Sequence, residues 1–244
     1  MGQLFDQVGL TTNGTVLVRK LERLKQAGLS HLNISLDSLV PAKNEFITRR
    51  PDASKKVLLA IDSALELGIQ SVKLNVVAIN KFNCDEFADF AELTRDRDID
   101  VRFIEFMPFS ENDWSQNKFI PMADILERLK VSYPSIAKIE GEDKSSTSKG
   151  YKINGYKGQI GFISSMSKHF CGGCNRIRLT ADGNLKVCLF DNREVNLKEL
   201  MEAGASDDEL SSVIKTALSK KHFSHGGVDS ILKRSNRHMV RIGG

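Results

Sequence analysis

Long apolar runs are missing from this sequence of 244 residues, and cysteine is scarce in it. No uninterrupted apolar segment approaches the roughly 18 residues that a membrane-spanning helix needs. The first residues, Met-Gly-Gln-Leu-Phe-Asp, lack the basic segment and the apolar core of a secretory signal peptide. Only four cysteines are present, and three of them are clustered, which argues against a secreted disulfide scaffold. These absences predict a soluble intracellular protein with no membrane partner.

The distribution of charge along the sequence shows no basic patch of the kind that binds nucleic acid. The 35 Lys and Arg residues alternate with 31 Asp and Glu residues, and the net charge is +4. A nucleic-acid-binding domain normally concentrates its basic residues in a patch or stripe. The sequence therefore predicts no nucleic-acid partner, but it is compatible with an anionic small molecule.

Three of the four cysteines, Cys171, Cys174 and Cys188, have the spacing C-x2-C-x13-C. Thiolates gathered in one place are typical ligands of zinc and of iron–sulfur clusters. Because no fourth cysteine lies nearby, a cubane cluster held here would keep one iron open to a substrate. Arg176 and Arg178 follow the second thiol closely, and guanidinium groups bind anions such as phosphate. The pattern favours a cluster that takes part in chemistry.

A structural zinc site is the alternative interpretation of the same cysteines. Structural zinc is normally four-coordinate, and three cysteines with one histidine are a common ligand set. The fourth ligand would then be His169, His222 or His225.

The first half of the chain repeats a short apolar strand, a polar loop and an amphipathic helix. This rhythm is typical of parallel α/β architecture. Gly28 and Gly68 predict helix ends, and Asn83 and Glu86 have the spacing of a capping box. Strands are expected at residues 8–10, 31–36, 72–79 and 101–107.

Active sites of such folds use polar residues at the carboxyl ends of the strands. These ends are expected to carry Thr11, Ser35, residues 73–75 and residues 102–107. The second half changes character. It predicts a helix over residues 122–129 and a hairpin over 151–163 that turns at Asn154-Gly155.

Six short segments occur in a specific order over essentially the whole chain. They are Leu-Thr-Thr-Asn-Gly (10–14), Asn-Ile-Ser-Leu-Asp-Ser (33–38), Lys-Leu-Asn-Val-Val (73–77), Arg-Phe-Ile-Glu-Phe-Met-Pro (102–108), the cysteine run with Asn-Arg-Ile-Arg-Leu, and a terminal Gly-Gly. The ordered set resembles the GTP 3′,8-cyclase family, which is the molybdenum cofactor biosynthesis protein A family of radical S-adenosylmethionine (SAM) enzymes. Overall, the sequence is most similar to the animal form of this family.

The resemblance implies the C-terminal part of an incomplete (β/α)6 TIM-like barrel, followed by an α+β iron–sulfur domain. The barrel part would span residues 1–132, and the [4Fe-4S] and GTP-binding domain residues 133–244. The family's C-x3-C-x2-C motif, which binds a first [4Fe-4S] cluster and SAM, does not occur in these residues. The first strand–helix units are therefore expected to be absent from 1–132.

The resemblance also assigns roles by position. It implies that the three cysteines hold the family's second [4Fe-4S] cluster, whose open iron contacts the guanine of GTP. The other implied residues are Thr11, Lys73, Arg176, Ile177 and Arg178 for GTP, Ser35 and Met107 for SAM, and Arg102, Gly243 and Gly244 for the catalytic cavity.

The implied activity is conversion of GTP to 3′,8-cyclo-7,8-dihydro-GTP, a lyase reaction of molybdenum cofactor biosynthesis upstream of the cyclic pyranopterin monophosphate synthase. SAM and the first cluster would be held only by the complete protein, so we expect this chain to be inactive alone. A non-catalytic short isoform that binds GTP or a partner is the alternative. A homodimer or association with the full-length enzyme, in the cytoplasm or the mitochondrial matrix, completes the expectations.

Overall fold

The computed structural model describes residues 5–110, 112–141, 143, 145–222, 224, 226–234 and 237–242. The chain forms two compact units, one of Met1–Phe106 and Asn117–Lys168, and one of Met107–Gln116 and His169–Gly244. The assignment of residues 1–132 to the barrel and 133–244 to the [4Fe-4S] and GTP-binding domain stays a prediction. None of the helices in the described part of the chain has the length and apolar character that a membrane crossing requires.

The first unit is built on a seven-stranded sheet in the order β1-β2-β3-β4-β7-β6-β5. The pairs from β1 through β2, β3 and β4 to β7 are parallel, while β6 and β5 add an antiparallel edge next to β7. The predicted parallel α/β architecture is confirmed. The strands are β1 (Gly9–Thr12), β2 (His31–Ser35), β3 (Ser71–Ala78), β4 (Asp100–Glu105), β5 (Ala137–Lys138), β6 (Lys149–Lys152) and β7 (Gln159–Ile163).

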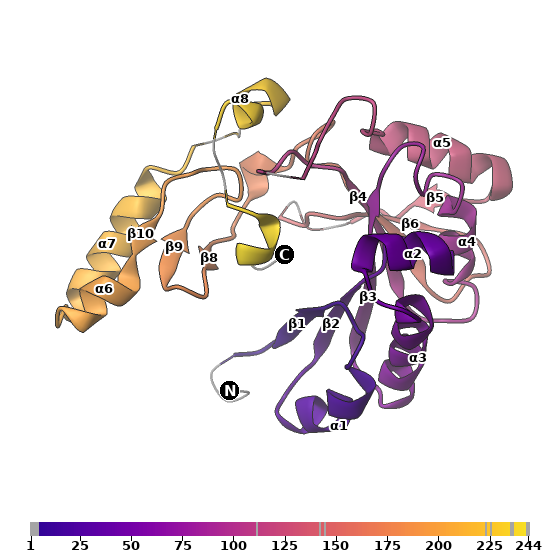
Figure 1. Ribbon diagram of the computed structural model, residues 1–244, viewed down its shortest axis with the longest axis horizontal. Helices are drawn as coiled ribbons and strands as arrows, with labels where there is room; N and C mark the ends of the chain where they lie inside the picture. Colours follow the sequence, from indigo (N-terminus) through magenta and orange to yellow (C-terminus); the bar gives the residue numbers. More distant parts are fainter. Residues whose placement is uncertain are drawn as a thin grey trace. The chain divides into compact units, whose positions relative to one another are not determined.

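Helices cover one face of this sheet, where α1, α3, α4 and α5 lie (Figure 1). Alternate strand residues such as Leu32, Leu74 and Phe103 are buried against them and form the core. As expected, Gly28 and Gly68 stop α1 and α3 from the position just after the C-cap, where their φ angles are 98° and 70°. The helices are α1 (Val18–Gln26), α2 (Pro41–Thr48), α3 (Ala53–Glu66), α4 (Phe87–Glu92) and α5 (Met122–Ser132).

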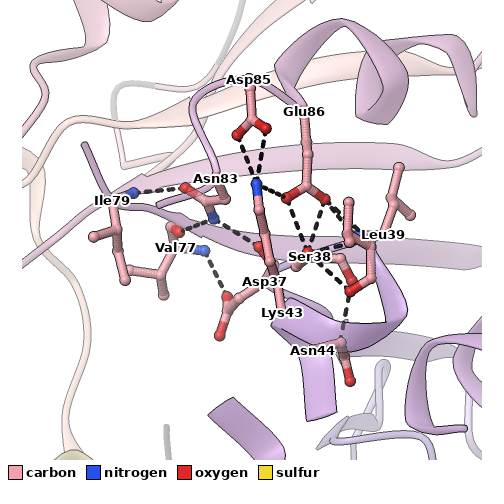
Figure 2. A network of polar contacts seen from close by, with 11 residues as sticks. Asp37, Ser38, Leu39, Lys43, Asn44, Val77, Ile79, Asn83, Asp85 and Glu86 are labelled. Atoms are coloured by element: carbon pink, nitrogen blue, oxygen red, sulfur yellow. Dashed lines mark hydrogen bonds and ion pairs between the residues drawn. The ribbon is translucent and has the colours of Figure 1, made fainter. Parts of the chain in front are cut away.

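The expected hairpin is present, since β6 and β7 pair antiparallel on either side of Asn154-Gly155. The expected capping box is not. The α4 helix begins at Phe87 without a side-chain cap, and the Asn83 side chain accepts a hydrogen bond from the N–H of Ile79. The Glu86 carboxylate turns to the β2–α2 connection instead, where it accepts hydrogen bonds from the N–H groups of Leu39 and Val40 (Figure 2).

Glu105, the last residue of β4, has a buried carboxylate with several donors. It accepts hydrogen bonds from the backbone N–H groups of Met122, Met166 and Ser167, each at 2.8 Å, and from the Ser167 hydroxyl. The start of α5 and the turn after β7 are therefore held by one side chain.

The second unit contains a small three-stranded sheet in the order β10-β9-β8, with antiparallel neighbours. Its helix α7 begins with a capping box formed by Ser206 and Glu209. The elements are the short 3-10 helix η1 (Cys171–Gly173), β8 (Arg178–Leu179), β9 (Asn184–Lys186), β10 (Val195–Asn196), α6 (Leu197–Glu202), α7 (Asp207–Ser219), α8 (Val228–Leu232) and η2 (Met239–Arg241).

Candidate functional site

The sheet face opposite the helices is polar, and it carries four of the predicted site residues. Strand register places Thr11, Asn33, Lys73 and Asp100 in one row across β1, β2, β3 and β4. The Asn33 amide donates a hydrogen bond of 3.4 Å to the Thr11 hydroxyl. Two of the predicted GTP residues therefore lie on the same face of one sheet.

A second row lies two residues further along the strands. Here Ser35 is in register with Asn75, which is in register with Arg102, and Arg102 with Gly161. Because side chains alternate along a strand, both rows project from the same face. The Arg102 guanidinium donates to the Asp100 carboxylate at 2.5 Å, which joins the two rows.

The electrostatics of this face are set by neighbouring cations. Burial and the Arg102 charge lower the pKa of Lys73, and Asp100 partly opposes them. Burial and the Lys73 charge lower the pKa of His31 in the same strand as Asn33. Clustered cations in a partly dry environment are suited to an anionic ligand such as phosphate.

Four buried polar atoms of the first unit have no hydrogen-bond partner among the described residues. Buried polar groups are normally paired, so each unpaired atom needs an explanation such as a water, an ion or a ligand. The sequence places only Asn75, within residues 73–75, among the expected site positions. Strand alternation from Arg102 leads to Asp100, while Asn33 is found through its register with Lys73. The atoms are Asn33 Oδ1, Asn75 Oδ1, Asp100 Oδ1 and Ser148 Oγ.

The expected location at strand ends is only partly correct. Ser35 does end β2, and it lines a cavity of about 220 Å³ together with Asp37, Asn44 and Arg50. Lys73 lies near the start of β3 and Arg102 near the start of β4, because both strands continue for several residues beyond them. Lys73 and Arg102 therefore lie on the polar face of the sheet, away from the carboxyl ends of its strands.

The first two cysteines lie on a tight turn in the second unit. Cys171 opens the 3-10 helix η1, and the N–H of Cys174 donates to the Cys171 carbonyl at 3.1 Å. This bond closes the turn between the two cysteines. Arg176 follows, with its guanidinium 5.7 Å from the ring centre of Phe170, and Ile177 is exposed.

Cys174 is surrounded by donors that favour its thiolate. Burial alone would raise the pKa of this thiol, but hydrogen bonds from the Arg176 backbone and the Lys221 ammonium hold it below its ordinary value. The Lys221 nitrogen is 3.4 Å from the Cys174 sulfur. Thiolates are the metal-binding form of cysteine, so this environment is suited to a metal ligand.

Arg178 is electrostatically coupled to the second and third cysteines. Burial lowers the pKa of Arg178, and the charges of Cys174 and Cys188 oppose that change. Arg178 belongs to β8 and is in register with Lys186 of β9, two residues before Cys188. Two cysteines that are 14 residues apart in sequence therefore both act on the guanidinium of Arg178.

The three-thiol metal site itself stays a prediction. Among the described residues, no group of three or more His, Cys, Asp or Glu side chains is close enough to hold a metal ion. That statement includes His169 and His222, while His225, Gly243 and Gly244 lie outside the described residues. The donor set nevertheless fits a thiolate-bound cluster, because Lys221 favours the thiolate of Cys174 and the charges of Cys174 and Cys188 both act on Arg178.

Met107, the remaining predicted residue, begins the 107–116 segment of the second unit. Its carbonyl accepts a hydrogen bond of 2.7 Å from the Asn112 amide. Nearby in the sequence, Phe109 stacks on Phe190 with ring centres 5.8 Å apart. This segment is thereby fixed to the loop that follows Cys188.

Matches to two protein families, one over the parallel sheet and one over the part with the cysteine turn, show the class of this protein. Residues 3–94 match the Radical SAM superfamily, and residues 99–227 match the family described as Molybdenum Cofactor Synthesis C. The chain is therefore a radical SAM protein, a superfamily that uses [4Fe-4S] clusters and SAM.

Curated relatives identify the family within this class. The chain is 45% identical to GTP 3′,8-cyclase of Syntrophomonas wolfei, over 98% of this chain and 73% of the relative. It is 48% identical to the mitochondrial GTP 3′,8-cyclase of Arabidopsis thaliana, over 97% of this chain and 60% of the relative. It is 51% identical to molybdenum cofactor biosynthesis protein 1 of Mus musculus, over 97% of this chain and 37% of the relative. The chain belongs to the GTP 3′,8-cyclase family, and it spans less than two thirds of the length of the plant and mouse relatives.

Proposed function

We propose that this chain carries the GTP site and the second [4Fe-4S] cluster of a GTP 3′,8-cyclase. The observation that carries the proposal is the position of Arg178 on β8, where the charges of both Cys174 and Cys188 act on its guanidinium. When bound, the cluster would supply an iron that is open to the guanine base. Cys171, Cys174 and Cys188 would hold it.

The chain's own cations would bind the nucleotide. Arg176 and Arg178 follow Cys174, so their guanidinium groups would hold phosphate or base near the cluster. On the sheet of the first unit, Lys73 would supply positive charge and Thr11 a hydroxyl donor to GTP. Arg102 is fixed by Asp100 and would support the same cavity.

The remaining proposed roles concern SAM and the chain terminus. Ser35 lines a cavity and would bind SAM, and Met107 would provide an apolar contact to SAM. Gly243 and Gly244 would approach the reacting groups closely, since glycine has no side chain to obstruct them. The product would be 3′,8-cyclo-7,8-dihydro-GTP, passed on to the cyclic pyranopterin monophosphate synthase.

Anaerobic reconstitution with ferrous iron and sulfide tests the metal part of the proposal. We expect a brown protein with about four irons per chain, as the cubane requires. Cys188→Ser should lose most of that iron, while Cys84→Ser, outside the proposed ligand set, should keep it. A colourless chain that binds one zinc would show that the structural alternative is correct.

Binding of GTP is tested by equilibrium dialysis on the iron-loaded chain. Arg178→Ala should weaken binding at least tenfold, because a charge-assisted contact is lost. Arg128→Ala, on α5 of the first unit, serves as the matched control. Equal affinities of wild type and Arg178→Ala would contradict the proposed GTP site.

Binding of GTP without turnover is the second candidate function. The observation that favours it is the absence of a C-x3-C-x2-C triplet from these 244 residues. An assay with SAM, GTP and dithionite separates the two functions. Cyclised product would exclude the binding-only function, and GTP binding without product would support it.

A further inference from the structure

Lys221 lies just beyond the end of α7 and directs its ammonium to the cysteine turn. Its nitrogen is 3.1 Å from the Cys174 carbonyl, 3.1 Å from the Arg176 carbonyl and 3.4 Å from the Cys174 sulfur. An ammonium group has three N–H donors, and all three acceptors belong to one short loop. The end of α7 is therefore attached to the residues that carry the second cysteine.

The backbone carbonyl of the neighbouring Lys220 connects the same helix end to the loop that carries the third cysteine, Cys188. Its carbonyl accepts a hydrogen bond of 3.1 Å from Arg193, whose Nε is 2.9 Å from the Asp191 carboxylate. The Asp191 carbonyl in turn accepts a hydrogen bond from the fully buried ammonium of Lys186. Lys186 and Asp191 flank Cys188, so these bonds close the loop that holds its thiol.

The charge of Lys186 is balanced by a further pair of ions. Glu194 Oε1 is 3.6 Å from the Lys186 nitrogen, and Glu194 Oε2 is 2.6 Å from the Arg237 guanidinium. Arg237 also pairs with Asp182 at 2.6 Å. Ion pairs thus partner the charge of Lys186, which flanks Cys188. Burial of a cation that has such a partner destabilises the fold far less than burial of an unpaired cation.

We propose that Lys221 is a positioning residue for the [4Fe-4S] cluster, and that its hydrogen bond to the Cys174 sulfur raises the reduction potential of that cluster. The inference rests on the proposed function. The reduced cluster carries one more negative charge than the oxidised cluster, so a cation beside a ligand sulfur stabilises the reduced form more. The same ammonium fixes the turn that presents Cys174.

Three variants of the 244-residue chain test this role after anaerobic reconstitution. Lys221→Met removes charge and donors, and Lys221→Gln keeps donors without the charge. Lys220→Met is the matched control, because its exposed side chain makes no hydrogen bond or ion pair within the described residues. The measurements are iron per chain, the rate of iron loss to a chelator, and the midpoint potential in a titration with dithionite as the reductant.

We expect Lys221→Met to shift the reduced-to-oxidised ratio at least tenfold towards the oxidised form, which corresponds to 59 mV for a one-electron couple. It should also lose iron several-fold faster than wild type. Lys221→Gln should show an intermediate potential, and Lys220→Met should match wild type in both measurements.

Two outcomes would overturn the inference, and they are distinguishable. If wild type holds the cluster and both Lys221 variants keep its potential and its rate of iron loss, the proposed function stands and the role of Lys221 is wrong. If wild type takes up no iron, the proposed function fails together with this role. Should Lys221→Met not fold, the midpoint potential of Lys221→Gln alone tests the role of Lys221. A potential equal to that of wild type in this variant would show that the role is wrong.

Discussion

At the residue scale, Asp37 is a carboxyl group whose surroundings disfavour its charge. Burial raises the pKa of Asp37 to about 6, and the hydrogen bond from the N–H of Val77 opposes the rise only in part (Figure 2). Between about pH 4 and pH 6, the folded chain therefore keeps a proton here that the unfolded chain has lost. The free energy of unfolding consequently receives a contribution that is present at low pH and disappears as the pH rises through 6.

Asp37→Asn should remove this dependence. The pKa difference corresponds to at most about 3 kcal/mol. The variant should therefore become more stable relative to wild type as the pH is raised from 4 to 7, because the amide oxygen still accepts from Val77 and carries no charge. Urea unfolding at several pH values measures the difference. Asp85→Asn is the control. Lys43 lowers the pKa of Asp85, so this carboxyl is ionised in both the folded and the unfolded chain above about pH 4, and the stability difference from wild type should stay constant from pH 4 to 7. Identical pH profiles for Asp37→Asn and wild type would contradict the raised pKa of Asp37.

Sequence reasoning at the residue scale found the chemistry it could read from neighbours in the chain. The cysteine spacing and the two adjacent arginines are visible as letters, but Lys221 is 47 positions away from Cys174, and only the fold brings it to the sulfur. Asp100 was also missed, because its role depends on the register that places it beside Lys73 and on the ion pair with Arg102. Contacts between distant segments carry no local signal.

At the element scale, the Glu86 carboxylate connects α4 to the segment that joins β2 and α2. It accepts from the N–H of Leu39 at 2.6 Å, the N–H of Val40 at 3.2 Å and the Ser38 hydroxyl at 2.8 Å, and it pairs with Lys43 at 3.0 Å (Figure 2). Glu86 is buried, so these bonds are made away from water. One side chain thereby satisfies two backbone donors ahead of α2.

Glu86→Gln should lower the free energy of unfolding by roughly 2–4 kcal/mol, because one acceptor oxygen becomes an NH₂ group that faces other donors. Urea unfolding at neutral pH measures the loss. Glu45→Gln is the matched control on the exposed side of α2 and should stay within about 0.5 kcal/mol of wild type. A loss of similar size in both variants would show that the buried carboxylate has no special role.

The elements themselves were well predicted where periodicity is strong and poorly where a polar side chain has a choice of partners. The strands, the glycine-terminated helices and the hairpin follow from apolar spacing and turn residues. Asn83 and Glu86 have capping-box spacing, but tertiary acceptors and donors outcompete the local pairing. At α7, Ser206 and Glu209 have the same spacing without such competitors, and there the box forms.

At the scale of the whole molecule, the two units differ in how much apolar core they own. The large core of the first unit contains Phe87, Phe90, Phe103 and Phe162. In the described part of the second unit, the buried apolar side chains are few and outside that core, namely Leu185, Val187, Phe190, Ile231 and Ile242. A unit with little apolar burial gains proportionally more stability from a bound metal group.

Iron loading should therefore protect the second unit selectively. Hydrogen exchange with and without the reconstituted cluster should slow at least tenfold in residues 169–193, while β1 to β4 should exchange at the same rates in both states. Mass spectrometry of peptides from the two units measures the difference. Uniform protection of both units, or none, would contradict a cluster held by Cys171, Cys174 and Cys188.

Glu105 has a consequence for how this sheet tolerates change. The first turn of α5 and the bend after β7 are more than forty residues apart in sequence, yet both donate backbone hydrogen bonds to the Glu105 carboxylate. Replacement of this one carboxylate would remove a hydrogen-bond acceptor from both stretches at once. A substitution at Glu105 would therefore loosen the start of α5 and the bend after β7 together.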